Sequence, residues 1–245
     1  PELQSLFQHY MYGYLPAVTS VKATLTASNT DLFGGKASWK SLALHYGPDG
    51  TPPLGLLLII PNTQKGIPPV FVGINFCGNH TVLTDPKVPL TRSWYRGSCP
   101  GCENETATDK GRGGQLDVWN AEMIIDRGYA LATFYYGDVD PDKNTNDFMD
   151  GVHPHFFKDG QTEPGKHDWG AVAAWAYGVH RVIDFLEMDQ TVDTKRLALV
   201  GHSRLGKATL FAGALDERIR VVIPHQAGCG GTAPNRFNVG ESVER

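Results

Sequence analysis

The sequence predicts an α/β fold in which helices cover both faces of a mostly parallel central sheet. Short apolar runs bounded by Gly and Pro alternate along the chain with longer stretches of helical periodicity, which is typical of strand–helix–strand units. The chain has 245 residues, of which 41% are apolar, enough to bury one large core. A glycine-flanked polar motif follows one apolar run directly, and sites in such sheets form at the carboxyl ends of strands.

The expected elements follow from these runs in chain order. Strands are expected at 38–46, 54–60 and 70–75, where Gly and Pro turns separate apolar segments. A helix is expected at 117–127, because Gly128 follows it as a stop signal. The alternation then continues with strand, helix, strand, helix and strand at 129–136, 168–188, 195–200, 205–215 and 221–224.

Two segments do not fit the alternation. Residues 81–115 and 137–167 are rich in Gly, Pro, Asp and Asn and are too long to be plain connections. Long loops at strand ends usually shape a site, so we expect these two to do so. The sequence has no internal repeat, low-complexity tract or interdomain linker, which predicts a single domain over 1–245.

Charge and hydropathy exclude two classes of partner. The net charge of −4 offers no basic surface for nucleic acid. No window approaches the roughly 18 apolar residues that a membrane span requires. We therefore expect neither nucleic-acid nor membrane partners.

The motif Gly201-His-Ser-Arg-Leu-Gly-Lys207 predicts a strand that turns sharply into a helix, with Ser203 at the apex. This geometry exposes the hydroxyl and points the following backbone N–H groups at whatever the serine attacks. It is a serine-hydrolase signature. The spacing departs from the common Gly-x-Ser-x-Gly, since Leu205 stands where the second glycine is expected and Gly206 comes one residue later.

Several separated segments, in order, extend this motif into a family resemblance. They are residues 75–81 (NFCGNHT), 135–138 (YYGD), 171–176 (AVAAWA), 212–218 (AGALDER) and 228–231 (GCGG). With them the chain resembles the glucuronoyl esterases of carbohydrate esterase family fifteen, in particular the bacterial branch. The resemblance implies an α/β-hydrolase, a three-layer sandwich without metal or cofactor. It also implies a substrate, the ester that joins glucuronic acid on xylan to lignin alcohols, and a secreted or periplasmic location.

The resemblance assigns roles to individual residues. Ser203 is the expected nucleophile, and Arg204 resembles the family arginine that stabilises the oxyanion. Lys207, one helical turn after the serine, is at the position that contacts hydroxyls of the glucuronate ring. The loop with Cys77 and Gly78 follows the strand at 70–75 and is the expected source of a second oxyanion donor.

A catalytic serine also requires a histidine base and an acid that orients it, which complete a catalytic triad. The sequence does not show either residue clearly. The family position for the acid falls on Gln226, and a glutamine cannot carry the charge that stabilises an imidazolium. The resemblance implies that both the acid, from a later loop, and the histidine lie beyond Arg245. Residues 240–245 are typical of the start of a helix, so we expect the chain to be a fragment that is inactive alone. The visible histidines are not expected to act as the base; these are His153, His155, His167, His202 and His225.

Two further patterns are weak metal signals. Cys99 and Cys102 have the spacing of half a zinc site, but no second pair of cysteines follows. The spacing therefore predicts a loop disulfide or plain thiols. Cys77 and Cys229 are isolated in the sequence. Residues 138–146 imitate a calcium loop but lack its glycine and glutamate, which predicts a solvated acidic turn. Asp138, at a strand end, either borders the pocket or anchors the structure.

Two alternative functions remain open at this stage. An acetyl-xylan or other carbohydrate esterase would use the same scaffold with a different pocket. A catalytically silent carbohydrate-binding homologue would explain Gln226 and the absence of an evident base.

Overall fold

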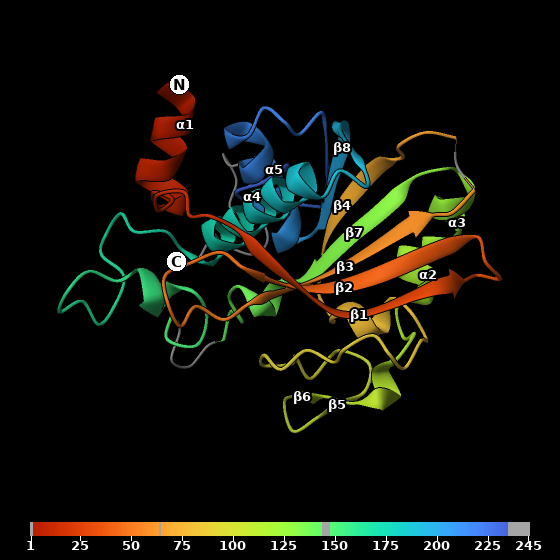
Figure 1. Ribbon diagram of the computed structural model, residues 1–245. Coiled ribbons are helices and arrows are strands. Elements are labelled where there is room, and N and C mark those ends of the chain that lie inside the picture. The colour runs from red at the N-terminus through yellow and green to blue at the C-terminus, as the bar shows by residue number, and fades with distance from the viewer. Residues whose placement is uncertain (1, 64, 144–147, 235–245) are drawn as a thin grey trace.

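A seven-stranded mixed sheet forms the centre of the molecule, in the order β1-β2-β3-β7-β4-β8-β9 (Figure 1). The computed structural model describes residues 2–63, 65–143 and 148–234. The strands of this sheet are β1 (Lys22–Leu32), β2 (Ala37–His45), β3 (Leu54–Pro61), β4 (Pro69–Asn75), β7 (Ala130–Tyr135), β8 (Asp193–His202) and β9 (Val221–His225). A separate small hairpin joins β5 (Cys102–Glu103) to β6 (Thr106–Ala107).

Five of the described strands in this sheet point the same way, so the α/β expectation of a mostly parallel sheet is confirmed. Strands β7, β4, β8 and β9 are parallel neighbours. Strands β1, β2, β3 and β7 pair antiparallel, which turns β1 and β3 against the other five. Short connections join β1 to β2 and β2 to β3, and such links favour antiparallel pairing.

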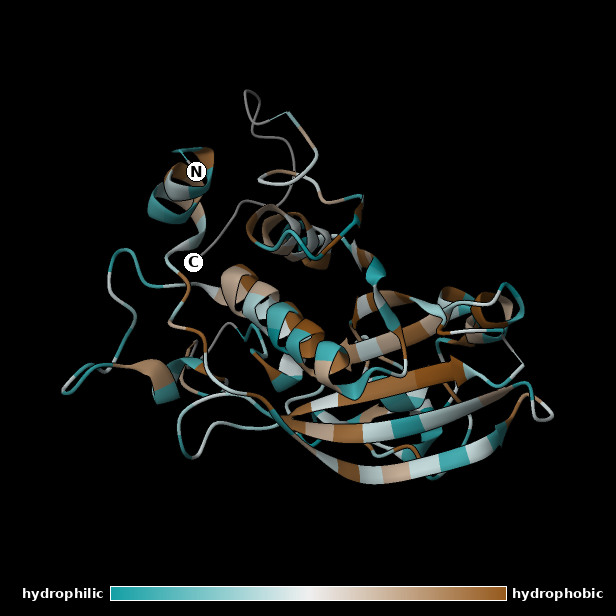
Figure 2. Ribbon diagram, turned by 45° about the horizontal axis from the view of Figure 1, so that its top comes forward, coloured by the Kyte–Doolittle hydropathy of each residue, from teal (hydrophilic) through white to brown (hydrophobic). Residues whose placement is uncertain are grey.

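Strand β1 was not predicted from the sequence. Its segment is rich in Thr, Ser, Asn and Asp, and most of its residues are exposed. It lies at the edge of the sheet and pairs with β2 alone, so it needs little apolar surface to form. Figure 2 shows this gradient, with brown central strands and paler or teal positions on β1.

Helices cover both faces of the sheet, as predicted. The helices α4 (Ala171–Asp189) and α5 (Arg204–Leu215) lie on one side, and α2 (Leu116–Trp119) and α3 (Ala121–Asp126) on the other (Figure 1). Two apolar clusters correspond to these layers, one between the sheet and α4 and α5, the other beneath α3. The short helix α1 (Glu2–Phe7) precedes the sheet and has no buried residue.

The single helix expected at 117–127 is instead two short helices. Asn120 adopts a left-handed conformation with φ of 42° between α2 and α3, and asparagine tolerates this region better than most residues. The break lets Trp119 pack over Gly73 of β4, where a β-carbon would lie 2.5 Å from the indole ring. Tertiary packing therefore overrides the helical periodicity here.

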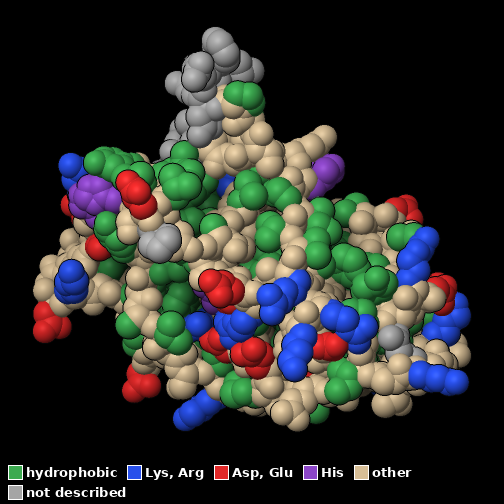
Figure 3. All heavy atoms as spheres, turned by 90° about the horizontal axis from the view of Figure 1, so that it is seen from above, with side chains coloured by type: hydrophobic (Ala, Val, Ile, Leu, Met, Phe, Trp, Pro, Cys, Tyr) green, Lys and Arg blue, Asp and Glu red, His purple; other side chains and the backbone are tan. Residues whose placement is uncertain are grey.

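The face formed by α4 and α5 carries acidic and basic side chains close together (Figure 3). Arg218 pairs there with Asp184, Glu187 and Asp216. Hydrogen bonding to these carboxylates, with Asp216 first, raises the pKa of Arg218. This face is a solvated surface of mixed charge rather than a basic patch.

Candidate active site

Ser203 occupies a sharp turn between β8 and α5. Its backbone has φ of 55° and ψ of −126°, a conformation rarely adopted by residues other than glycine. The Ser203 N–H donates to the carbonyl of His225 at 2.9 Å, which ties the turn to the end of β9. The predicted strand–turn–helix geometry is therefore present, with the serine at the carboxyl edge of the parallel strands.

Two glycines on either side of Ser203 make the turn possible. A β-carbon on Gly201 would lie 2.3 Å from the Thr209 Oγ1, and one on Gly206 would lie 3.1 Å from the Gly201 carbonyl oxygen. Leu205 is fully buried in the core. The glycine at position 206 thus lets the start of α5 approach the end of β8 closely. Position 205 can therefore carry a side chain that packs into the core.

Arg204 points toward one of the long loops, because its Nη1 donates to a carboxylate oxygen of Asp142. Both side chains are about a quarter exposed. Burial raises the pKa of the nearby Tyr136 to about 12, and the charge of Asp142 adds to the effect. The sequence did not single out Asp142 as a partner of Arg204, since 62 residues separate the two.

Lys207 is only 3% exposed, although it lies on the first turns of α5. Lysines are rarely buried to this extent without a function or a partner. Lys207 is therefore not a solvated helix lysine. A role in substrate contact stays a prediction.

The loop after β4 carries the candidate oxyanion donors near Cys77 and Gly78. Gly78 has φ of 77°, and a β-carbon there would meet the His80 ring at 3.0 Å. The Asn75 amide donates to Asn79 and to Thr133 of β7, both at 2.9 Å, and so holds the start of the loop. The loop is thereby fixed relative to two central strands.

The Phe76 ring connects this loop to the serine turn. It lies edge-on to Tyr136, with ring centroids 5.6 Å apart, and edge-on to His202, the neighbour of Ser203, at 6.3 Å. The ends of β4, β7 and β8 therefore meet around one aromatic side chain. This contact brings the predicted oxyanion loop and the predicted nucleophile to one edge of the sheet.

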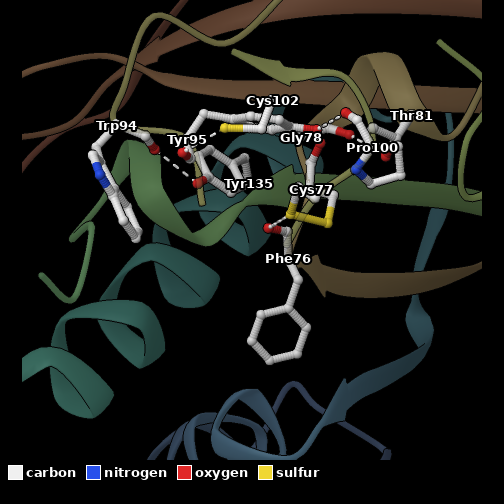
Figure 4. Close-up of a disulfide and its surroundings, with 10 residues drawn as sticks. Phe76, Cys77, Gly78, Thr81, Trp94, Tyr95, Pro100, Cys102 and Tyr135 are labelled. Carbon is white, nitrogen blue, oxygen red and sulfur yellow. Dashed lines mark hydrogen bonds between the residues drawn. A yellow bond between two sulfur atoms is a disulfide. The ribbon is translucent and has the colours of Figure 1, made fainter. Parts of the chain in front are cut away.

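A disulfide joins Cys77 to Cys99, whereas the spacing of Cys99 and Cys102 indicated those two as the pair (Figure 4). The description of Cys77 as isolated is wrong, because the fold brings the long loop back over the end of β4. Tyr95 Oη supports the arrangement by donating to the carbonyls of Cys77 and Pro100, each at 2.9 Å. Cys102 and Cys229 are free cysteines. Of the two states left open for Cys102, it therefore has the plain thiol.

Asp138 anchors the long loops rather than lining the site. Its buried carboxylate accepts hydrogen bonds from the Gly55 N–H at 3.1 Å and from the hydroxyls of Thr91 and Ser93 at 2.7 and 2.8 Å. Burial raises the pKa of Asp138, while the three donors oppose that rise. Of the two roles left open for Asp138, the structure favours the anchor.

The acidic segment after Asp138 is not a solvated turn at Asp140. Asp140 is 1% exposed and lies 2.8 Å from the Nδ1 of the fully buried His153. Asn144 and Asn146, which belong to the same pattern, lie outside the described residues. Within 2–63, 65–143 and 148–234, no cluster of three or more His, Cys, Asp or Glu could hold a metal ion.

In the part of the chain that the structure describes, no histidine hydrogen-bonds the Ser203 hydroxyl. His202 and His225 instead face each other, with their Nδ1 atoms 3.0 Å apart. The His167 ring stacks on His9, with ring centroids 4.1 Å apart. Gln226 is exposed and directly follows β9, with φ of 50°.

Comparison with known proteins decides the family. The family model described as fungal glucuronyl esterase matches residues 115–244, more than half of the chain. The chain belongs to the glucuronoyl esterase family. The carbohydrate esterase MZ0003, from an unknown prokaryotic organism, is 39% identical over the whole chain. A glucuronoyl esterase structure from Solibacter usitatus superposes with a TM-score of 0.86 at 41% identity over 95% of the chain.

The chain spans a little more than half the length of these two relatives. It spans 56% of the length of MZ0003 and 59% of the Solibacter structure. A 4-O-methyl-glucuronoyl methylesterase from Phanerochaete chrysosporium is 36% identical over 65% of this chain and 37% of its own length. None of the described helices is long and apolar enough to cross a membrane.

Proposed function

We propose that the full-length protein hydrolyses esters of glucuronic acid through a serine acyl-enzyme. The observation that carries this proposal is the strained turn that presents Ser203 at the carboxyl edge of the sheet, in a chain of the glucuronoyl esterase family. A half-buried serine in this strained geometry is of little use to a binding module. The strain therefore favours the catalytic role over a silent carbohydrate-binding protein.

Each step of the reaction has a candidate group. The Ser203 oxygen attacks the uronate carbonyl, the alcohol leaves with a proton, and water then releases glucuronate from the acyl-enzyme. The negative charge that forms on the carbonyl oxygen is stabilised by Arg204 and by backbone N–H groups near Cys77 and Gly78. Lys207 binds hydroxyls of the sugar.

Among the described residues, no histidine hydrogen-bonds the Ser203 hydroxyl to act as proton acceptor. The neutral amide of Gln226 can orient a histidine but cannot stabilise its charged form. The proposal therefore requires another Asp or Glu as the acid, together with a histidine base, from residues that the structure does not describe.

The substrate class comes from the family. The Phanerochaete relative is named for 4-O-methyl-glucuronoyl ester cleavage, and we propose the same ester on glucuronoxylan, with lignin alcohols as leaving groups. Such a polymer stays outside the cell, so the proposal includes secretion or a periplasmic location. The Cys77–Cys99 disulfide fits that location, because disulfides persist in oxidising compartments.

Replacement of the nucleophile tests the proposal. We expect Ser203→Ala in the full-length protein to abolish hydrolysis of benzyl glucuronate while the circular dichroism spectrum stays unchanged. Arg204→Ala should lower kcat by about 10²- to 10³-fold, the usual cost of one oxyanion donor. Ser98→Ala, at an exposed position, is the matched control and should keep full activity.

Three outcomes would decide against parts of the proposal. Turnover retained by Ser203→Ala removes the serine mechanism. A wild-type protein that neither hydrolyses the ester nor reacts with a serine-directed phosphonate is the silent homologue. Faster turnover of acetylated xylan than of the glucuronate ester assigns the protein to the other esterase class.

A further inference from the structure

The Arg204 side chain is flexible, and its position in the helix is electrostatically unfavourable for a positive charge. It begins α5, where the positive end of the helix dipole disfavours a cation. A long arginine side chain also loses rotamer entropy when it is held in one position. Its ion pair with Asp142 opposes both costs and favours one orientation of the guanidinium.

Asp142 is itself held by the backbone. Its φ of 54° lies in the left-handed region, which aspartate tolerates better than most residues. Its N–H donates to the Oδ1 of Asp140 at 2.9 Å, so the Asp140 side chain closes a tight turn that presents the Asp142 carboxylate.

Asp140 is the buried residue at which this turn begins. Its other carboxylate oxygen lies 2.8 Å from the Nδ1 of His153, and its backbone carbonyl accepts a hydrogen bond from the Trp175 indole of α4 at 3.0 Å. His153 lies between the rings of Phe148 and Trp169, at centroid distances of 4.7 and 5.0 Å. The core therefore fixes the loop end that carries Asp142.

We propose that Asp142 is a positioning residue for catalysis: it orients the Arg204 guanidinium beside Ser203, and the buried Asp140–His153 pair supports it. This inference rests on the proposed role of Arg204. Oxyanion donors act only when they are held within about 3 Å of the developing charge. A guanidinium with a fixed orientation needs no reorganisation during the reaction. In this proposal, that gain exceeds the loss caused by the Asp142 carboxylate, which partly cancels the positive charge of Arg204.

Kinetics of the full-length protein test the inference. Asp142→Ala should lower kcat by about 10-fold or more with KM changed less than about 2-fold, because it disturbs a group that acts in the transition state. Asp142→Glu keeps the charge and should restore part of the loss. Asp159→Asn, an exposed acid of the same loop, is the matched control and should leave both constants unchanged.

A double variant separates positioning from an independent effect. Because Asp142 acts through Arg204, Arg204→Ala with Asp142→Ala should have the kcat of Arg204→Ala alone. Losses that multiply would overturn the inference while leaving the function of Arg204 intact. A higher kcat in Asp142→Ala would also overturn it, since the pair would then hold Arg204 away from the reaction. An unchanged kcat in Arg204→Ala removes the role of Arg204 and the inference together.

A second measurement does not depend on turnover. In isotope-labelled Ser203→Ala protein, the Arg204 Nε–H signal should show restricted motion by NMR relaxation. Asp142→Ala on that background should make this signal mobile, and Asp159→Asn should not. An Arg204 signal equally ordered without Asp142 would overturn the inference even if the protein proved to be a silent homologue.

Discussion

Gly201 permits the serine turn because it has no side chain. A β-carbon at this position would lie 2.3 Å from Thr209 Oγ1 and 2.4 Å from the Leu205 carbonyl oxygen. Both atoms belong to the first turns of α5, which cannot move without disturbing Ser203. We expect Gly201→Ala to lower the free energy of unfolding by at least about 1–3 kcal/mol, the usual cost of overpacking. Urea denaturation followed by circular dichroism measures this change.

Gly97 provides the control for that substitution. No atom lies within 4 Å of a β-carbon at Gly97, and its φ is outside the left-handed region. Gly97→Ala should therefore change the unfolding free energy by less than about 1 kcal/mol. Equal losses in the two variants would show that the contacts around Gly201 are not what limits the turn.

At the scale of elements, the Cys77–Cys99 disulfide joins the loop after β4 to the long segment that follows it. The bond spans 22 residues, and closing a loop of that length stabilises a fold by about 3 kcal/mol in the chain-entropy account. Replacing both cysteines with serine should lower the free energy of unfolding by about 2–4 kcal/mol. Thermal or urea unfolding with and without dithiothreitol measures the effect.

The free thiol of Cys102 makes this prediction specific. Cys102→Ser leaves the disulfide intact and should change the unfolding free energy little. Dithiothreitol should destabilise the wild-type protein and Cys102→Ser, but not the variant without Cys77 and Cys99. A reversed result, in which Cys102→Ser abolishes the response to reductant, would mean that Cys99 pairs with Cys102 after all.

At the scale of the whole molecule, two buried histidines make stability depend on pH. Burial lowers the pKa of His80 to about 4, with Arg112 adding to the effect, and burial also lowers the pKa of His180. The unfolded chain binds protons at these residues below about pH 6.5, whereas the folded protein does not. The stability that these neutral histidines contribute is therefore fully present above about pH 6.5 and is lost as the pH falls toward 4.

Urea denaturation between pH 7.5 and 5 tests this dependence. We expect the free energy of unfolding to fall, with His80 contributing up to about 2 kcal/mol at pH 5. His80→Leu should flatten the dependence, whatever its effect at neutral pH. His45→Gln, at an exposed position, is the control and should keep the wild-type slope. An unchanged slope in His80→Leu would contradict the assignment of this loss to His80.

Prediction from the sequence succeeded where the information is local. The glycine spacing around Ser203 determines the turn, because neighbouring atoms leave no room for a side chain at position 201 and little room at position 206. The alternation of apolar runs likewise predicts the central strands β3, β4 and β7, which bury both faces in the core, and β8, which buries alternate residues near its end. The single-domain organisation and the location of the triad partners beyond Arg245 stay predictions.

The sequence by itself determined the α/β class and the serine turn, because each depends on residues close together in the chain, and it indicated the family through several short motifs that are each local. Only the tertiary structure decided which distant residues meet: Cys77 with Cys99, Asp142 with Arg204, and Asp140 with His153. Such contacts depend on how the two long loops fold back over the strand ends. No periodicity or spacing within a loop encodes that path, which is set by burial of side chains such as Asp138 and Tyr95 against the finished sheet.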